Sequence, residues 1–160
     1  MAEEVIEEVH DDLLHLMNRE QSSLLTHVKI NNAYSGEVVK LDIGYAKVVL
    51  NTLDIMKADE LGLVHGGFIF SAADFAAMAA VNEPNVVLAS CNCLFLSPVR
   101  VGDQVVFEAE EHQKEGRKRT VHVKGSVYDI KVFEGEFKTV ITERHVLRLD
   151  LLKNIDDIRK

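Results

Sequence analysis

The pattern of hydrophobic and polar residues predicts an amphipathic helix, followed by strands that flank a second, apolar helix. Val5, Val9, Leu13 and Leu16 recur at helical spacing, which predicts an amphipathic helix over residues 3–28. Beyond it, alternating stretches bounded by turn residues predict six strands. These strands span Gly36–Asp42, Tyr45–Thr52, Val86–Leu96, Gln104–Glu111, Arg119–Asp129 and Lys131–Val146.

The most apolar stretch of the chain, Gly66–Val81, lies between the second and third strands and predicts a helix. It ends before Asn82-Glu83-Pro84, which is a helix stop signal. The helix is rich in alanine and apolar nearly all round, so it must be buried. The strands after it are joined by short connections and are therefore antiparallel. We predict an α+β fold in which an antiparallel sheet wraps around one long central helix.

This pattern divides the 160-residue chain into three segments. Residues 1–28 form an N-terminal helical extension, and residues 29–147 form the domain built from the sheet and the central helix. Residues 148–160 form a tail whose spacing of apolar residues predicts a short helix. No internal repeat or low-complexity segment is present.

The charge distribution excludes some classes of partner. The 18 basic and 26 acidic residues give a net charge of -8, which disfavours binding to nucleic acid. The acidic N-terminus is unlike a signal peptide, and the longest apolar run is too short to span a membrane, so we expect a cytoplasmic protein with no membrane span. Cys91 and Cys93 are predicted to be reduced thiols, and no pair of histidines has helical metal-ligand spacing, so we expect no metal site.

One carboxylate, Asp74, lies inside the apolar helix. Burying it costs several kcal/mol or forces it to be neutral, on the order known for unpaired buried charges. It is therefore a candidate general base or nucleophile, unless that helix face opens to solvent, to another subunit or to a hydrogen-bonding loop. Gly66 and Gly67 begin the same helix, where free N–H groups can bind an anion or form an oxyanion hole, or simply permit a tight turn. His65, beside them, either contacts the substrate or orients the loop.

The spacing between these candidates constrains the assembly. Gly67 and Asp74 are seven residues apart, or about 10 Å along a helix axis. A reacting carbonyl should lie about 3 Å from both the oxyanion donor and the attacking group. The two groups can therefore act on one substrate only if they come from different chains. We predict an obligate homodimer with two composite sites.

Two motifs identify a resemblance. Residues 63–74 read Leu-Val-His-Gly-Gly-Phe-Ile-Phe-Ser-Ala-Ala-Asp, and residues 95–103 read Phe-Leu-Ser-Pro-Val-Arg-Val-Gly-Asp. They resemble the His-Gly-Gly…Asp motif and the strand-to-turn signature of the hot-dog-fold acyl-CoA thioesterases of the phenylacetate-pathway type, over roughly residues 36–147. The resemblance implies that Asp74 is the base or nucleophile and that Gly67 polarises the thioester carbonyl. It also implies dimers joined edge to edge, often paired into tetramers, and coenzyme A only as part of the substrate, with no further cofactor.

The chain departs from that family at two positions. Asp59 stands where the family often has Asn, and Leu88 stands where some members have a water-orienting Ser, although Ser90 and Asn92 are nearby polar candidates. Residues 119–137 also resemble the effector domain of bacterial lipid-synthesis repressors, which binds malonyl-CoA without hydrolysing it. A non-catalytic acyl-CoA-binding or regulatory protein is therefore the alternative. A hot-dog dehydratase is disfavoured, because its differently spaced His and acid are not found.

The acyl-CoA prediction assigns further contacts. We expect Phe70 and Met78 to line an apolar tunnel for the acyl chain, and Gly66 and Asn92 to contact the substrate. Arg100 and a cluster of basic residues are a candidate binding site for the coenzyme A phosphates, with an exposed hairpin as the alternative. The cluster comprises Lys114, Arg117, Lys118, Arg119 and Lys124. The predicted reaction is hydrolysis of a fatty or aromatic acyl-CoA, in fatty acid metabolism.

Overall fold

The structure is a computed structural model that describes residues 23–149. Its centre is one six-stranded antiparallel sheet with the strand order β1-β2-β4-β5-β6-β3. The strands are β1 (Glu37–Asp42), β2 (Tyr45–Asn51), β3 (Val86–Phe95), β4 (Gln104–Glu115), β5 (Lys118–Val127) and β6 (Ile130–Ile141). All six predicted strands are confirmed, although β4 runs four residues further than expected and β6 ends at Ile141 rather than at Val146.

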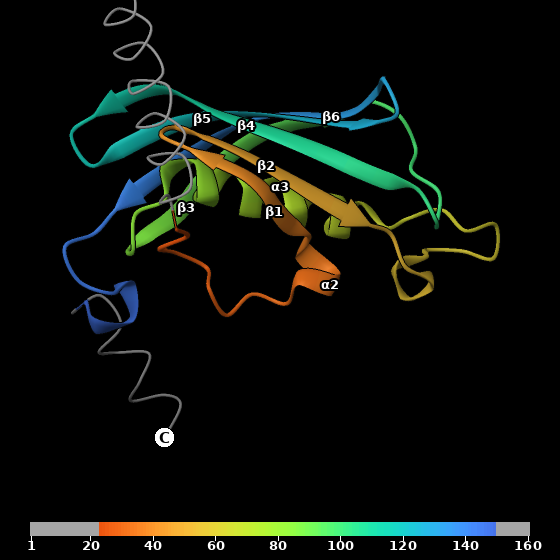
Figure 1. Cartoon of the computed structure of the whole chain (residues 1–160), viewed down its shortest axis with the longest axis horizontal. Helices are drawn as coiled ribbons and strands as arrows, with labels where there is room; N and C mark the ends of the chain where they lie inside the picture. The colour runs from red at the N-terminus through yellow and green to blue at the C-terminus, as the bar shows by residue number, and fades with distance from the viewer. Residues whose placement is uncertain (1–22, 150–160) are drawn as a thin grey trace, which may run out of the picture.

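The predicted central helix is α3 (Gly66–Val81), and the sheet curves over it as the hot-dog arrangement requires (Figure 1). Alanines make up much of its buried surface, and their small side chains let the strands pack close to the helix axis. The helix ends at Asn82, which has a left-handed conformation (φ 50°) and whose N–H donates to the carbonyl of Met78. No helix within residues 23–149 is long and apolar enough to cross a membrane.

The chain before β1 covers part of the side of α3 that faces away from the sheet (Figure 1). A short helix, α2 (Asn32–Ser35), packs on α3, and the ring of His27 stacks on Phe75 at 6.5 Å between centroids. The amide oxygen of Asn82 accepts a 2.7 Å hydrogen bond from the N–H of Leu25, which ties this segment to the end of α3. The segment thus leaves only part of the α3 surface accessible.

The predictions for the two ends of the chain are only partly covered by the described residues. Residues 23–28 are not helical, so the end of the predicted N-terminal helix is wrong, and residues 1–22 lie outside the described part. The helix α2 was not predicted. Two short 3-10 turns, η1 (Asp54–Met56) and η2 (Val146–Arg148), complete the elements. The predicted helix in the C-terminal tail falls on residues 150–160, which are also outside the description.

Strand β3 lies at one edge of the sheet and contains a β-bulge. Leu88 pairs with Thr139 and Ser90 pairs with Lys138, so Ala89 is an extra residue that β6 does not match. After the bulge, the side chains that point toward the core are those of odd-numbered residues instead of even-numbered ones. Leu88, Cys91 and Cys93 pack against the core, whereas Ser90 and Asn92 are exposed.

Candidate active site

Asp74 lies near the middle of α3, on the face of the helix that also carries Phe70, and it is only partly buried. Its Oδ1 atom is buried and has no hydrogen-bond partner among residues 23–149. Burial raises the pKa of Asp74 from its ordinary value of 3.8 to about 6. A carboxyl group with this pKa is mostly ionised at neutral pH yet is far more basic than an exposed aspartate, which suits a general base.

Two thiols of β3 lie on the same side of the sheet as α3. Burial, contact with Cys93 and the charge of Asp74 together raise the pKa of the Cys91 thiol to about 12. Cys91 is therefore close to Asp74 and remains protonated at neutral pH, which argues against a nucleophilic role. Both thiols are free. The sequence reasoning did not assign either of them to the site.

Gly66 and Gly67 form the first turn of α3, where helix N–H groups lack partners inside the helix. Neither N–H has a hydrogen-bond acceptor within residues 23–149. The preceding loop is held by the N–H of Val64, which donates to Val99 (2.8 Å), and by the N–H of His65, which donates to Met56 (2.9 Å). The two glycine N–H groups are therefore fixed in direction and available to an anionic or carbonyl oxygen.

His65 occupies the N-cap position of α3, but its side chain makes no capping hydrogen bond. The ring is exposed and meets the ring of Phe68 edge to face, 6.2 Å between centroids. It also lies directly beside Gly67, because a Cβ atom built on Gly67 would be 2.9 Å from the His65 Nε2 atom. His65 thus borders the helix start, as expected for a residue next to the substrate or one that orients the loop.

An apolar groove begins at Gly66. Its inner part, about 260 Å³, is walled by Ile69 of α3 and by Phe95, whose ring would be 3.3 Å from a Cβ at Gly66. Leu63, Pro98 and Val99 also line a neighbouring, more polar depression of about 490 Å³, here called the outer part of the groove, which includes Arg100 and Asp103. The helix start and an exposed cation therefore border neighbouring depressions that share three lining residues.

The outer part of this groove contains two of the residues singled out in the sequence. The guanidinium group of Arg100 has no hydrogen-bond or ion-pair partner in the described part of the chain. The Asp59 side chain stabilises the loop that follows it, because its Oδ1 atom accepts hydrogen bonds from the N–H groups of Leu61 (3.0 Å) and Leu63 (3.1 Å). The carboxylate at the position where the family often has Asn thus shapes the loop.

Three residues that are predicted to contact the substrate, Phe70, Met78 and Asn92, differ in their position and exposure. Phe70 is half-buried and stacks on Phe137 at 5.7 Å, next to the side of α3 that carries Asp74. Met78 is completely buried in the core, so it does not line an accessible tunnel in this chain. Asn92 alternates with Cys91 and Cys93 and is exposed on the outer face of the sheet, away from Asp74. The contact between Asn92 and the substrate therefore stays a prediction, which its position in this chain does not support.

The predicted basic cluster is only partly one patch, and three of its cations are paired with carboxylates. Arg117 pairs with Glu143, and Arg119 and Lys114 both pair with Glu111, at 3.7 and 3.6 Å. Lys124 lies further along β5, in a separate depression.

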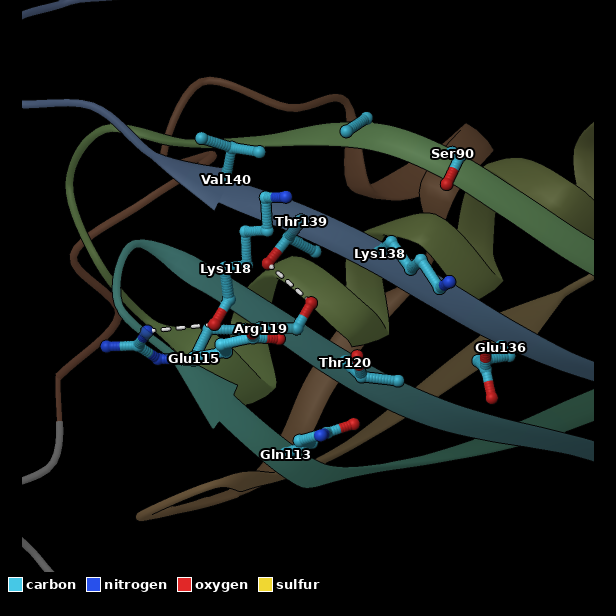
Figure 2. Close-up of a pocket in the computed structure, with 11 residues that line it drawn as sticks. Ser90, Gln113, Glu115, Lys118, Arg119, Thr120, Glu136, Lys138, Thr139 and Val140 are labelled. Atoms are coloured by element: carbon cyan, nitrogen blue, oxygen red, sulfur yellow. Dashed lines mark hydrogen bonds between the residues drawn. The ribbon is translucent and has the colours of Figure 1, made fainter.

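Lys118 lies with Arg119 and Lys138 in a polar groove of about 360 Å³ on the outer face of the sheet, with α3 on the far side of the strands (Figure 2). This outer groove shares no lining residue with the groove that starts at Gly66. Within residues 23–149, no group of three or more His, Cys, Asp or Glu side chains is arranged to hold a metal ion.

Comparisons with known proteins agree with this geometry. Residues 61–132 match the model of the family described as the thioesterase superfamily. A candidate esterase of Saccharolobus solfataricus is 33% identical over 115 residues, which cover 69% of this chain and 73% of that protein. An uncharacterised protein of Pyrococcus horikoshii has a structure with 44% identity and a TM-score of 0.78, covering 79% of this chain and 97% of that one. The PaaI protein of Escherichia coli, from the phenylacetic acid degradation operon, shares the fold at 22% identity and a TM-score of 0.66, with 71% and 84% coverage.

Other relatives are longer than this chain. A methylthioribose-1-phosphate isomerase of Aquifex aeolicus is 56% identical over 115 residues, which are 72% of this chain but 25% of that protein. The transcription factor FapR of Caldanaerobacter subterraneus is 30% identical over 114 residues, 71% of this chain and 57% of the relative. The chain thus spans a quarter of the one and just over half of the other.

Proposed function

The chain belongs to the thioesterase superfamily of hot-dog proteins, and from this premise we propose that it hydrolyses an acyl-CoA to the free acid and coenzyme A. The observation that carries the proposal is Asp74, a half-buried carboxylate with an unpartnered oxygen and a raised pKa. A surface carboxylate would be too weak a base, and a fully buried one would be protonated.

In the proposed reaction, Asp74 takes a proton from a water molecule whose oxygen attacks the thioester carbonyl. A C–O bond forms, and the carbonyl oxygen acquires a negative charge that the N–H of Gly67 stabilises. The C–S bond then breaks, and the departing coenzyme A thiolate takes the proton from Asp74. Water therefore supplies the hydroxyl group of the acid and the hydrogen of the thiol, and the carboxylate is regenerated.

The same reaction requires a homodimer, because Gly67 and Asp74 are about 10 Å apart along one helix. We propose that β3 joins the β3 strand of a second copy. Within the described residues β3 pairs only with β6, and the end of the strand exposes Leu94 and Phe95, followed by Leu96. An unpaired edge with apolar side chains is suited to such pairing. The two α3 helices would then lie side by side, and further pairing of dimers would give a tetramer.

For the coenzyme A phosphates we propose Arg100 as the principal contact. It lies at the outer end of the groove from Gly66 and its guanidinium group is unpaired. Arg117 and Arg119 are already engaged with carboxylates, and Lys118 lies on the other face of the sheet. The acyl chain would lie along α3 past Phe70. A cytoplasmic location is consistent with two free cysteines.

A non-catalytic acyl-CoA-binding or regulatory role is the second candidate. The observation that favours it is the similarity to a transcription factor, of which the chain matches just over half. Leu88 packs against the core and offers no hydroxyl group at the position where some thioesterases have Ser. Tight binding of acyl-CoA without turnover is the property that separates this candidate from the first.

The experiment measures coenzyme A release from short, long and aromatic acyl-CoAs by the wild type, by Asp74→Asn and by Asp129→Asn, a matched change in an exposed turn. Hydrolysis by the wild type and by Asp129→Asn, with a loss of at least about 100-fold in Asp74→Asn, supports the proposal. Binding of an acyl-CoA without turnover by the wild type favours the second candidate. Equal rates in all three proteins remove Asp74 from the mechanism.

A further inference from the structure

A pair of hydroxyl groups lies next to the proposed base. The Ser71 Oγ atom of α3 is 2.8 Å from the Ser35 Oγ atom, which belongs to the last residue of α2. Ser35 is buried and Ser71 is half-buried. Two hydroxyl groups that share one hydrogen bond keep one O–H donor and several acceptor lone pairs unused. Neither hydroxyl has another partner within residues 23–149.

Ser71 lies between the two groups that the proposed reaction uses. It follows Gly67 by four residues and precedes Asp74 by three. At about 100° per residue, the three side-chain positions fall within roughly 60° of one another on the helix surface. Along the axis, Ser71 is about 6 Å from Gly67 and about 4.5 Å from Asp74. It is therefore the polar side chain of α3 that lies between them on this face.

The two-fold arrangement brings Ser71 closer to the reacting atoms. If two antiparallel α3 helices place Gly67 of one protomer opposite Asp74 of the other, they cross near Phe70 and Ser71 of both chains. Each Ser71 then lies about one helical turn from an oxyanion donor and from a base. A water molecule between Gly67 and the partner's Asp74 would therefore lie about one helical turn along α3 from a Ser71 hydroxyl group.

We propose that Ser71 orients the attacking water and that Ser35 is the positioning residue that holds Ser71. When Ser71 donates its hydrogen to Ser35, its lone pairs are free to accept one hydrogen of the water. Asp74 accepts the other hydrogen, so the water presents a lone pair to the thioester carbonyl. The bond changes are those of the proposed hydrolysis, and this inference rests on that function.

The test compares Ser71→Ala, Ser71→Thr and Ser35→Ala with the wild type, and uses Ser126→Ala, on the outer face of β5, as the matched control. We expect kcat to fall about tenfold or more in Ser71→Ala with KM within about twofold, as for loss of one hydrogen bond to the reacting water. Ser71→Thr keeps the hydroxyl group and should remain within a few-fold of the wild type. Ser35→Ala should lie between them, and Ser126→Ala should match the wild type.

A second readout separates water orientation from stability. With methanol added, the ratio of methyl ester to free acid should rise in Ser71→Ala, because water loses its hydrogen-bond acceptor while methanol can occupy the vacated space. Wild-type kcat and an unchanged product ratio in Ser71→Ala would overturn the inference. So would a Ser71→Thr enzyme as slow as Ser71→Ala, or a fall in kcat that thermal denaturation fully accounts for. If the wild type hydrolyses no thioester, the proposed function itself fails. If the wild type hydrolyses thioesters and the Ser71 variants behave like it, only this inference fails.

Discussion

The imidazole ring of His65 lies so close to Gly67 that an added Cβ atom would be 2.9 Å from its Nε2 atom. The neighbour is a side chain on the surface rather than backbone, so a substitution at Gly67 moves the ring instead of breaking the helix. His65 and Gly67 therefore act as one unit at the start of α3. Removing the His65 ring makes room for a side chain at residue 67, so the role of the Gly67 N–H can be tested separately from the space that glycine leaves.

The first prediction concerns the Gly67 N–H and uses the His65→Ala background, in which the ring no longer obstructs residue 67. In that background Gly67→Ala keeps the N–H, whereas Gly67→Pro removes it at a helix position that tolerates proline. We expect kcat to be about 100-fold lower for the proline variant than for the alanine variant, as for loss of an oxyanion donor. Steady-state kinetics with circular dichroism as a folding control would measure this, and equal kcat values would contradict the assignment.

The second prediction concerns the composite site. Asp74→Asn chains keep a functional Gly67, and His65→Ala/Gly67→Pro chains keep a functional Asp74. Each homodimer should be nearly inactive, but a heterodimer contains one site with both groups intact. Unfolding the two variants together and refolding the mixture should restore activity to about a quarter of the wild-type value, because half of the dimers have one of two sites active. A mixture as inactive as its components would show that both groups act within one chain.

The third prediction is a pH profile. Asp74 must be ionised to accept a proton, and its pKa is about 6. We expect kcat/KM to fall about tenfold per pH unit below this value and to level off above it. Assays from pH 4.5 to 8.5 with a thioester of unchanging charge would measure the profile. A rate that is constant between pH 5 and 8 would argue against Asp74 as the base.

The fourth prediction concerns stability. Burial raises the pKa of Asp74 above the ordinary value of 3.8 that applies in the unfolded chain. The folded state therefore binds the proton more tightly, and stability falls as pH rises from about 4 to about 6. Asp74→Asn should be more stable than the wild type by up to about 3 kcal/mol at pH 7.5, and the difference should vanish near pH 3.5. Urea denaturation at both pH values measures this, and a destabilised variant at pH 7.5 would contradict it.

The fifth prediction separates the two proposed sites for coenzyme A phosphates. Arg100→Gln should raise KM for an acyl-CoA about tenfold and leave KM unchanged for the matching acyl-pantetheine, which lacks phosphates. Arg117→Gln is the matched control, because Arg117 is paired with Glu143. If Arg117→Gln shows the larger effect, the hairpin rather than the groove binds the phosphates.

Much of the fold could be predicted because its signals are repeated over many residues. The bounds of α3 follow from a 16-residue apolar stretch that ends before Asn82 and Pro84, and the strands follow from sustained alternation. The helix α2 is only four residues long, which is too short for a periodic signal. Asp74 and Gly67 stand out as candidates because a carboxylate in an apolar helix and two glycines at its start are unusual in the local sequence.

The differences between the predicted and the observed positions come from contacts that no local pattern reveals. The sequence predicts Asn92 near the substrate because it does not mark the bulge that reverses the alternation in β3. Met78 shares a helix face with Asp74, but it lies one turn further along α3 and is completely buried, whereas Asp74 is only partly buried. The basic cluster looked continuous because Glu111, which pairs with two of its members, reads as one acid among many.

Because of the bulge in β3, Ala89 is one extra residue in the strand, and the residues on both sides of it keep regular pairing with β6. Because Ser90 and Lys138 keep their pairing, deleting Ala89 would restore a regular strand without changing which side chains lie beside Asp74. A deletion anywhere between residues 90 and 95 would instead exchange inward and outward positions for part of the strand. This edge of the protein can therefore vary in length by one residue at a single place, and relatives that differ there can still have the same interior.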